Sequence, residues 1–113
     1  MELLIETLVE LGLKPTDTQV YIFLAKKGPQ RVKDLVNSLR ITKQQLYPSL
    51  KNLEERCVVN SSNERPAIFS AVPIEQVLDA LIKAKIKETQ HMIQNKEALL
   101  SKWKLKIRNS SET

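Results

Sequence analysis

The spacing of apolar residues predicts four helices in the first half of the chain. Apolar side chains recur every three or four positions in each segment, which is the period of one helix face. Gly12 suits a left-handed exit from the first helix, Pro15 opens the second, and Gly28-Pro29 stops it. Asp17 then lies in a first turn, where a carboxylate complements the positive end of the helix dipole. The predicted helices run over Glu2–Leu11, from Pro15 to Gly28, Val32–Leu39 and Thr42–Arg56.

The fourth helix is predicted to have two contrasting faces. The run Thr42-Lys-Gln-Gln45 is typical of a capping box, with Thr42 as the N-cap and Gln45 reaching back. Its apolar face consists of Leu46, Leu50, Leu53 and Cys57. Cys57 is therefore interpreted as a small core residue. Pro48 lies beyond the first turn and predicts either a kink or a later helix start. The opposite, polar face holds Lys43, Gln44, Tyr47, Pro48 and Lys51.

Two short β-like runs follow the fourth helix. Cys57–Val59 and Ala67–Val72 flank the polar segment Asn60–Pro66, which is typical of a hairpin tip. Gln30–Val32 is a further candidate for a short strand. The order of elements predicts a mainly α fold with a small β-hairpin: a winged helix-turn-helix followed by a long C-terminal coiled-coil helix.

The C-terminal part is predicted to be one long helix, Ile74 to about Ile107. Roughly 34 residues at 1.5 Å each span about 50 Å, which is longer than a small domain. We therefore expect the apolar face of this helix to be covered by a second copy of the chain and not by the chain's own domain. Residues 1–73 are assigned to DNA binding and 74–113 to dimerisation, with Asn109–Thr113 frayed. A heptad seam with polar members Thr89 and Lys96 is expected to pair the helices, parallel or antiparallel, through Ile82, Ile86, Ile93, Leu100, Trp103 and Ile107.

Composition and charge narrow the class of protein. Hydrophobic residues make up 42% of the 113 residues and charged residues 27%, as in globular domains. The net charge is +5, and its excess is concentrated in two zones. Residues 26–51 carry seven Lys and Arg against Asp34 alone, and residues 83–108 carry eight against two acids. Such zones favour polyanionic partners such as DNA, RNA or anionic lipid.

The chain holds few residues suited to catalysis or metal binding. Cys57 and His91 are its only cysteine and histidine and are far apart in sequence, so neither a zinc site nor an internal disulfide is expected. No nucleophile elbow, zinc-protease motif or phosphate-binding glycine loop occurs. We expect no cofactor, no small-molecule ligand and no enzymatic activity. The acidic, amphipathic N-terminus is not a signal peptide and no apolar run is long enough to cross a membrane, which predicts a cytoplasmic protein.

The polar face of the fourth helix is the candidate DNA-reading surface. Such a helix enters the major groove with its N-terminal residues at base edges. Gln44 can pair with adenine, Lys43 with guanine, and Lys51 with phosphate. An ordinary solvated helix face is the open alternative, and Gln45 is favoured for capping over base reading. The predicted DNA contacts are Thr42, Lys43, Gln44, Gln45, Tyr47 and Lys51, with Arg31 and Lys33 before the helix and Asn63 and Arg65 in the wing.

An ordered set of short motifs resembles one known family. The motifs are Leu11-Gly-Leu13, Val20-Tyr21, Gly28-Pro29, Leu46-Tyr47, Leu50, Leu53-Glu-Glu55 and Ala71-Val-Pro73. Together they are similar to the N-terminal domain of TrmB-type regulators, which are mostly archaeal winged-helix transcription factors. The resemblance runs from about Leu11 to Leu81. It implies operator binding as a dimer, base reading by Thr42–Arg56, and backbone contact by the loop around Asn63–Arg65.

Three positions depart from the family pattern. Arg40 stands where the family often has glycine, Pro48 where a helix former is usual, and Cys57-Val58 where Gly-Leu is common. These departures affect the expected docking angle and base preference. Many relatives carry a further sugar-sensing domain, for which this chain is expected to be too short, so sugar binding is not carried over.

Two rival functions are also compatible with this sequence. A winged helix also serves as a protein-interaction module, and a long apolar helix also serves in coiled-coil adaptors. The surplus of basic residues across 26–51 favours DNA. The prediction is a sequence-specific, dimeric transcriptional regulator that binds double-stranded DNA.

Overall fold

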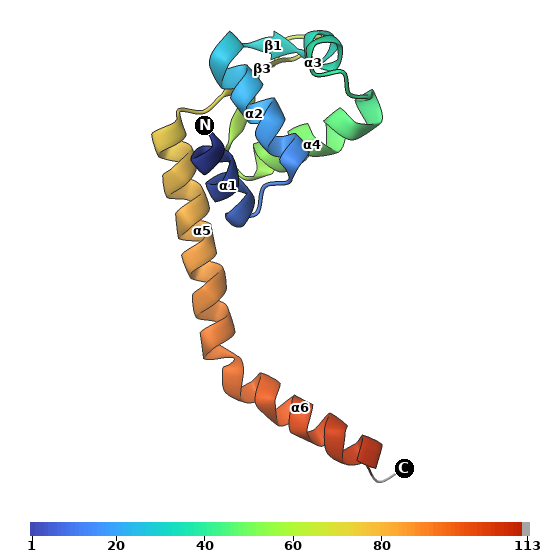
Figure 1. Cartoon of the computed structure of the whole chain (residues 1–113), viewed down its shortest axis with the longest axis vertical. Helices are drawn as coiled ribbons and strands as arrows, with labels where there is room; N and C mark the ends of the chain where they lie inside the picture. Colours follow the sequence, from blue (N-terminus) through green and yellow to red (C-terminus); the bar gives the residue numbers. More distant parts are fainter. Residues whose placement is uncertain (112–113) are drawn as a thin grey trace. The chain divides into compact units, whose positions relative to one another are not determined.

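The computed structural model describes residues 1–111. The chain consists of two compact units, Met1–Ile82 and Lys83–Thr113. The first unit contains a helical domain with a small sheet (Figure 1). The second contains the end of α5, which spans Ile74–Gln94, and all of α6, Lys96–Ser111. The remaining elements of the first unit are α1 Glu2–Glu10, α2 Pro15–Lys27, β1 Gln30–Arg31, α3 Val32–Leu39, α4 Lys43–Glu55, β2 Val59–Ser61 and β3 Ile68–Ala71.

The three strands form one antiparallel sheet in the order β1-β3-β2. Gln30 pairs with Phe69, and Val59 pairs with Ala71. The predicted hairpin and the predicted short strand are therefore parts of the same sheet. This architecture, helices followed by a β-hairpin wing, confirms the predicted winged helix-turn-helix.

The limits of the hairpin differ from the prediction. Cys57 and Val58 lie outside β2, while Asn60 and Ser61, expected at the tip, are paired within it. The Val58 amide donates to the Leu53 carbonyl over 2.8 Å, which keeps it in the helix exit. Cys57 at the same exit adopts a left-handed conformation with φ +63° and is exposed. The prediction of a core cysteine was wrong, because α4 ends at Glu55 and no longer carries Cys57 on its apolar face.

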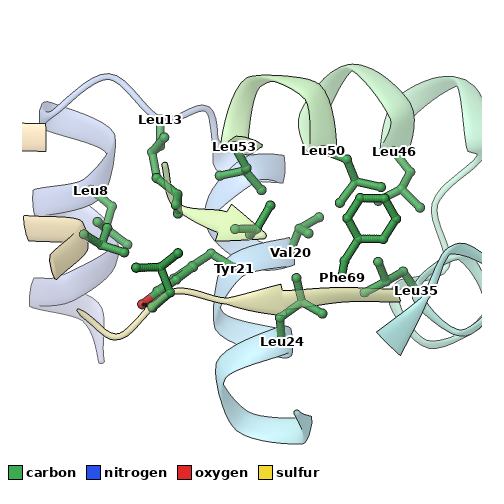
Figure 2. Packing of buried hydrophobic residues seen from close by; sticks show 14 of the residues in the cluster. Leu8, Leu13, Val20, Tyr21, Leu24, Leu35, Leu46, Leu50, Leu53 and Phe69 are labelled. Carbon is green, nitrogen blue, oxygen red and sulfur yellow. Dashed lines mark hydrogen bonds between the residues drawn. The ribbon is translucent and has the colours of Figure 1, made fainter. Parts of the chain in front are cut away.

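The core of the first unit surrounds α2. Figure 2 shows side chains from α1, α2 and α4 converging with Phe69 of β3. Each helix contributes the apolar face that its sequence period predicts. The largest fully buried side chains include Leu8, Leu13, Leu24, Leu35, Leu46, Leu53 and Leu81. Val77 and Leu81 are buried, so the first turns of α5 complete this core.

A buried carboxylate joins α2 to α4. Asp17 is 1% exposed, although its sequence position predicted only a first-turn carboxylate. Its Oδ2 accepts the Lys14 amide over 3.0 Å, which forms the N-terminal cap of α2. The two remaining donors come from α4: the Ser49 hydroxyl donates to Oδ1 over 2.5 Å, and the Asn52 amide donates to Oδ2 over 2.8 Å. One side chain thus caps one helix and holds another.

A second buried polar contact joins α2 to the start of α5. The Tyr21 hydroxyl donates to the Val72 carbonyl over 2.7 Å, across 51 residues of sequence. Burial, and to a smaller extent the nearby Glu75 carboxylate, raises the pKa of Tyr21 above its ordinary value of 10.0. The neutral phenol is therefore the form that the fold favours.

The second unit differs from the predicted single helix. The α-helix ends at Gln94 and a new one begins at Lys96, with Asn95 between them. The Asn95 side-chain amide lies 3.0 Å from the His91 ring nitrogen, and such local side-chain bonds of asparagine compete with the helical pattern. Residues 109–111, predicted to be frayed, continue α6. The remainder of that predicted tail lies outside the described residues.

We expect Asp17→Ala to lower the free energy of unfolding by about 2–4 kcal/mol, because the buried Ser49 hydroxyl and the part-buried Lys14 and Asn52 amides lose their acceptor. Asp34→Ala is the matched control. Asp34 also caps its helix from the third position, through the Arg31 amide, but it is exposed. Its loss is expected to cost only about 0.5 kcal/mol. Urea unfolding measures both, and equal losses would show that the contacts of Asp17 with α4 contribute nothing.

We expect the free energy of unfolding of Tyr21→Phe to fall less steeply with rising alkaline pH than that of the wild type. A raised folded-state pKa means that the stabilising contribution of Tyr21 is complete below pH 10 and is lost as the pH rises through the folded-state pKa. Urea unfolding at a series of pH values from 8 upward measures the slope. Tyr47→Phe removes the exposed phenol hydroxyl of α4 and is the control for the substitution itself. An unchanged slope in Tyr21→Phe would contradict this assignment.

Candidate nucleic-acid interface

The start of α4 is held by the capping box that the sequence predicted. The Gln45 amide donates to the Thr42 hydroxyl over 3.1 Å, and the Thr42 amide donates to the Gln45 side-chain oxygen over 3.0 Å. α4 therefore begins at Lys43 with Thr42 as its N-cap. These two side chains shape the helix end, and the oxygen of Gln45 is occupied by that role. The preference for Gln45 as a capping residue is confirmed.

The two faces of α4 separate as their sequence pattern predicted. Leu46, Leu50 and Leu53 are buried, each at most 2% exposed. Ser49 is also buried and faces Asp17. The other face is open to solvent, with Tyr47 53% exposed. The exposed side chains between positions 43 and 51 are Lys43, Gln44, Gln45, Tyr47, Pro48 and Lys51.

Charge varies along this exposed face of α4. Lys43 and Lys51 lie in its first nine residues, whereas Glu54 and Glu55 end the helix. All four side chains are exposed. The positive part of the face therefore spans the first nine of the 13 residues of α4. It includes the N-terminal residues that a recognition helix directs at base edges.

Pro48 lies within α4 without displacing its start. The helix is continuous from Lys43 to Glu55, so the option of a later start is wrong. Proline has no N–H, so the Gln44 carbonyl lacks its usual donor four residues on. Because Pro48 and Gln44 are both exposed, water can satisfy that carbonyl.

The turn before α4 is tight and left-handed. Arg40 ends α3 with φ 55° and ψ 44°, and its amide donates to the Val36 carbonyl. Glycine adopts this conformation at least cost, which explains why a glycine is common there in the family that the motifs resemble. The arginine keeps the same turn and places an additional exposed cation between α3 and α4.

The wing is organised by one serine. The Ser62 hydroxyl accepts from the Ile68 amide over 2.9 Å and from the Glu64 amide over 3.3 Å. The backbone of Ser62 also pairs with Ile68, which closes the base of the loop. Asn63 and Arg65, the predicted wing contacts, are both exposed at its tip.

Arg31 connects this wing to the helix-turn-helix. Its guanidinium donates to the Pro66 carbonyl over 3.3 Å, across 35 residues of sequence. Arg31 was predicted only as a DNA contact, so its structural role is an addition. Lys33, the next basic residue, is exposed on the first turn of α3.

The structure brings the cations of residues 26–51 to the surface. All seven are exposed, whereas Asp34, the single acid of this stretch, is engaged in capping α3. The exposed set consists of Lys26, Lys27, Arg31, Lys33, Arg40, Lys43 and Lys51.

Sequence reasoning missed the side chains that position α4 from behind. Asp17 binds Ser49 and Asn52, and the Arg56 guanidinium donates to the Leu11 carbonyl over 3.2 Å. A β-carbon at Gly12, whose φ is +109°, would lie 2.9 Å from that guanidinium. The only sequence signal was an aspartate at the third position of a helix, which does not reveal a partner 32 residues away.

Comparison with known proteins gives the family. A model described as "Sugar-specific transcriptional regulator TrmB" matches residues 8–75, more than half of the chain. The chain belongs to the TrmB family. This membership confirms the resemblance found in the sequence motifs, and it makes the chain a DNA-binding transcriptional regulator of the winged helix-turn-helix type. No curated protein matches the chain.

Two solved structures are similar in fold to this TrmB-family chain. AbfR of Staphylococcus epidermidis aligns with a TM-score of 0.55 and 20% identity, over 85% of this chain and 77% of its own. The reduced form of the transcriptional regulator YodB from B. subtilis aligns with a TM-score of 0.52 and 23% identity, over 80% of this chain and 88% of its own. At identities this low, the similarity shows a shared fold alone.

Two other kinds of site are absent from the described part of the TrmB-family chain. Within residues 1–111, no three His, Cys, Asp or Glu side chains gather as metal ligands. No helix of that same part is long and apolar enough to cross a membrane.

Proposed function

We propose that the chain binds double-stranded DNA sequence-specifically as a homodimer, with the N-terminal half of α4 in the major groove. The observation that carries this proposal is the exposed face of Lys43, Gln44, Tyr47 and Lys51, in a helix fixed by buried contacts on its other side. Family membership supplies the DNA-binding class. The side chains and their positions supply the proposed mode of binding.

Base reading is assigned to the first turn of α4. Gln44 offers a donor and an acceptor at one side chain, which matches the N6 and N7 edge of adenine. Lys43 donates to the acceptors of guanine. Thr42 and Gln45 are engaged with each other, so their role is to hold that first turn rather than to read bases.

Phosphate contacts are assigned to the basic residues around this turn. Lys51 lies two turns further along the same exposed face, and Tyr47 between them offers a hydroxyl donor. Lys33 and Arg40 precede α4 and are exposed, as is Arg65 in the wing. Cations spread on both sides of a recognition helix fix its register on the duplex without reading sequence.

Dimerisation is assigned to the second unit. No side chain from 83 to 110 is buried in the single chain. Large apolar side chains are nevertheless exposed there, including Ile86 at 51%, Ile93 at 66% and Trp103 at 61%. An extended apolar surface of this kind marks an interface, and two-fold dimers are the most common assemblies. The interface residues proposed are Ile82, Ile86, Ile93, Leu100, Trp103 and Ile107.

We expect Gln44→Ala or Lys43→Ala to weaken binding to the preferred sequence by about 5–100-fold and to relax the preference at one position. Lys51→Ala should weaken binding to all duplexes and reduce the salt slope by about one. Lys27→Ala is the control for a lost cation, since Lys27 is exposed at the last residue of α2 and is assigned no DNA contact. Fluorescence anisotropy measures each, with a duplex selected by wild-type binding from a random-sequence pool and with a scrambled duplex. Unchanged affinity in all three α4 variants would refute the assignment of α4.

We expect Trp103→Asp to raise the dimer dissociation constant at least 100-fold, because it places a charge where an aromatic side chain is buried between copies. Ser101→Asp adds the same charge on the opposite face of α6 and should leave the dimer intact. Sedimentation equilibrium measures both. A wild-type dimer that survives Trp103→Asp unchanged would exclude Trp103 from the interface.

A further inference from the structure

Helix α1 exposes an apolar stripe that its own domain does not use. Met1, Ile5 and Val9 recur at every fourth position and are 64%, 38% and 41% exposed. The side of α1 that faces the core carries Leu4 and Leu8 instead. Side chains four positions apart lie above one another, so the exposed three form a continuous strip along the helix.

An acidic stripe runs beside this apolar strip. Glu2, Glu6 and Glu10 each follow a member of the apolar strip by one residue, and α1 contains no basic residue. All three are exposed. Like charges at this spacing repel one another within an isolated helix, so a stripe of three favours a cationic neighbour.

The apolar strip continues into a groove of the first unit. Met1 and Ile5 line one wall of an open groove of about 540 Å³. The other wall comes from α2 and α3, with Ile22, Phe23 and Leu39 among its residues. The uncovered apolar surface is therefore wider than one helix face, as a docking site for a helix requires.

Helix α6 carries the complementary pattern. Leu99, Leu100 and Trp103 lie on one face and are 57%, 39% and 61% exposed. By helical spacing, Lys102 and Lys106 flank this face on one side, while Lys104 and Arg108 flank it on the other. Glu97 is the single acid of α6. An apolar stripe between two basic ones matches an apolar stripe beside an acidic one.

We propose that α6 of a second copy docks on α1 of the first, across the apolar strip and beside the acidic stripe. This inference rests on the proposed dimer. It assigns Leu100 and Trp103 of that interface to contact with α1, and leaves Ile82, Ile86 and Ile93 to pair the α5 helices of the two copies. Both surfaces occur once in every copy, so a two-fold axis uses each pairing twice. The nine residues of α1 extend about 14 Å and the 16 of α6 about 24 Å, so α6 is long enough to cover the strip. A duplex in place of α1 would neutralise the lysines but leave the apolar face of α6 uncovered.

The first experiment reverses charge on each side of the proposed contact. Glu2→Lys with Glu6→Lys gives one variant, and Lys102→Glu with Lys106→Glu gives the other. Each alone is expected to raise the dimer dissociation constant about 10–100-fold, because both copies of the contact then join like charges. Mixed together, the two variants should form a heterodimer of wild-type affinity, since both contacts again join opposite charges. Glu54→Lys with Glu55→Lys controls for the change in net charge, and sedimentation equilibrium measures all of them.

The outcomes separate this inference from the proposed function. If the variant with Glu2→Lys and Glu6→Lys dimerises with the wild-type dissociation constant, the α1 contact is overturned. The dimer through the second unit would then remain. A monomeric wild-type chain would overturn both. If the Lys102 and Lys106 reversal weakens DNA binding but not the dimer, the basic stripe contacts DNA and the inference is wrong.

A cross-linking experiment tests whether the occupant is a second copy. In a Cys57→Ser background, chains carrying Glu6→Cys are mixed with chains carrying Lys102→Cys and oxidised. The inference predicts a disulfide between the two different chains. A chain carrying both substitutions that closes its disulfide within itself, as a monomer, would show that α6 covers α1 of its own chain and would overturn the proposal.

Discussion

The buried Asp17 carboxylate is the contact on which the proposed interface depends. It caps α2 through the Lys14 amide and accepts hydrogen bonds from Ser49 and Asn52 on the inner side of α4. A carboxylate excluded from water is stable only when its oxygens are satisfied, so this arrangement tolerates little movement of α4 relative to α2. The exposed Lys43 and Gln44 on the outer side therefore point in a direction set by the core. A recognition helix requires such fixed geometry to distinguish base edges.

Polar contacts and backbone conformation also fix the wing and the turn between α3 and α4. Arg31 binds the Pro66 carbonyl, and Ser62 closes the base of the wing, so the wing is connected to the helix-turn-helix by polar contacts. The left-handed Arg40 sets the angle between α3 and α4. Each of these residues shapes the position of the exposed cations, and in Arg40 the shaping residue is itself an exposed cation.

Local patterns in the sequence predicted most of the fold. The apolar period located α2, α3 and α4, and Thr42 with Gln45 identified the start of α4, because these signals arise within a few residues. Contacts between distant residues were not predictable in this way. Asp17 and its α4 partners, and Tyr21 with Val72, are joined only by tertiary packing. The errors have the same origin. Cys57 follows the helix period but lies in a left-handed turn after α4, and the heptad period across 82–107 continues through the break at Asn95.

The surfaces of the molecule fall into two chemical kinds, and this division carries the functional account. Residues 26–51 expose cations without large exposed apolar neighbours other than Tyr47, as suits a polyanion. α1 and α6 expose apolar stripes beside charges of opposite sign, as suits a second copy of the chain.

The most direct test is to recover bound sequences from a random duplex pool, with anisotropy at low and at physiological salt. The account predicts binding that weakens steeply with salt and enriches a two-fold symmetric motif. Absence of binding even at low salt would contradict it.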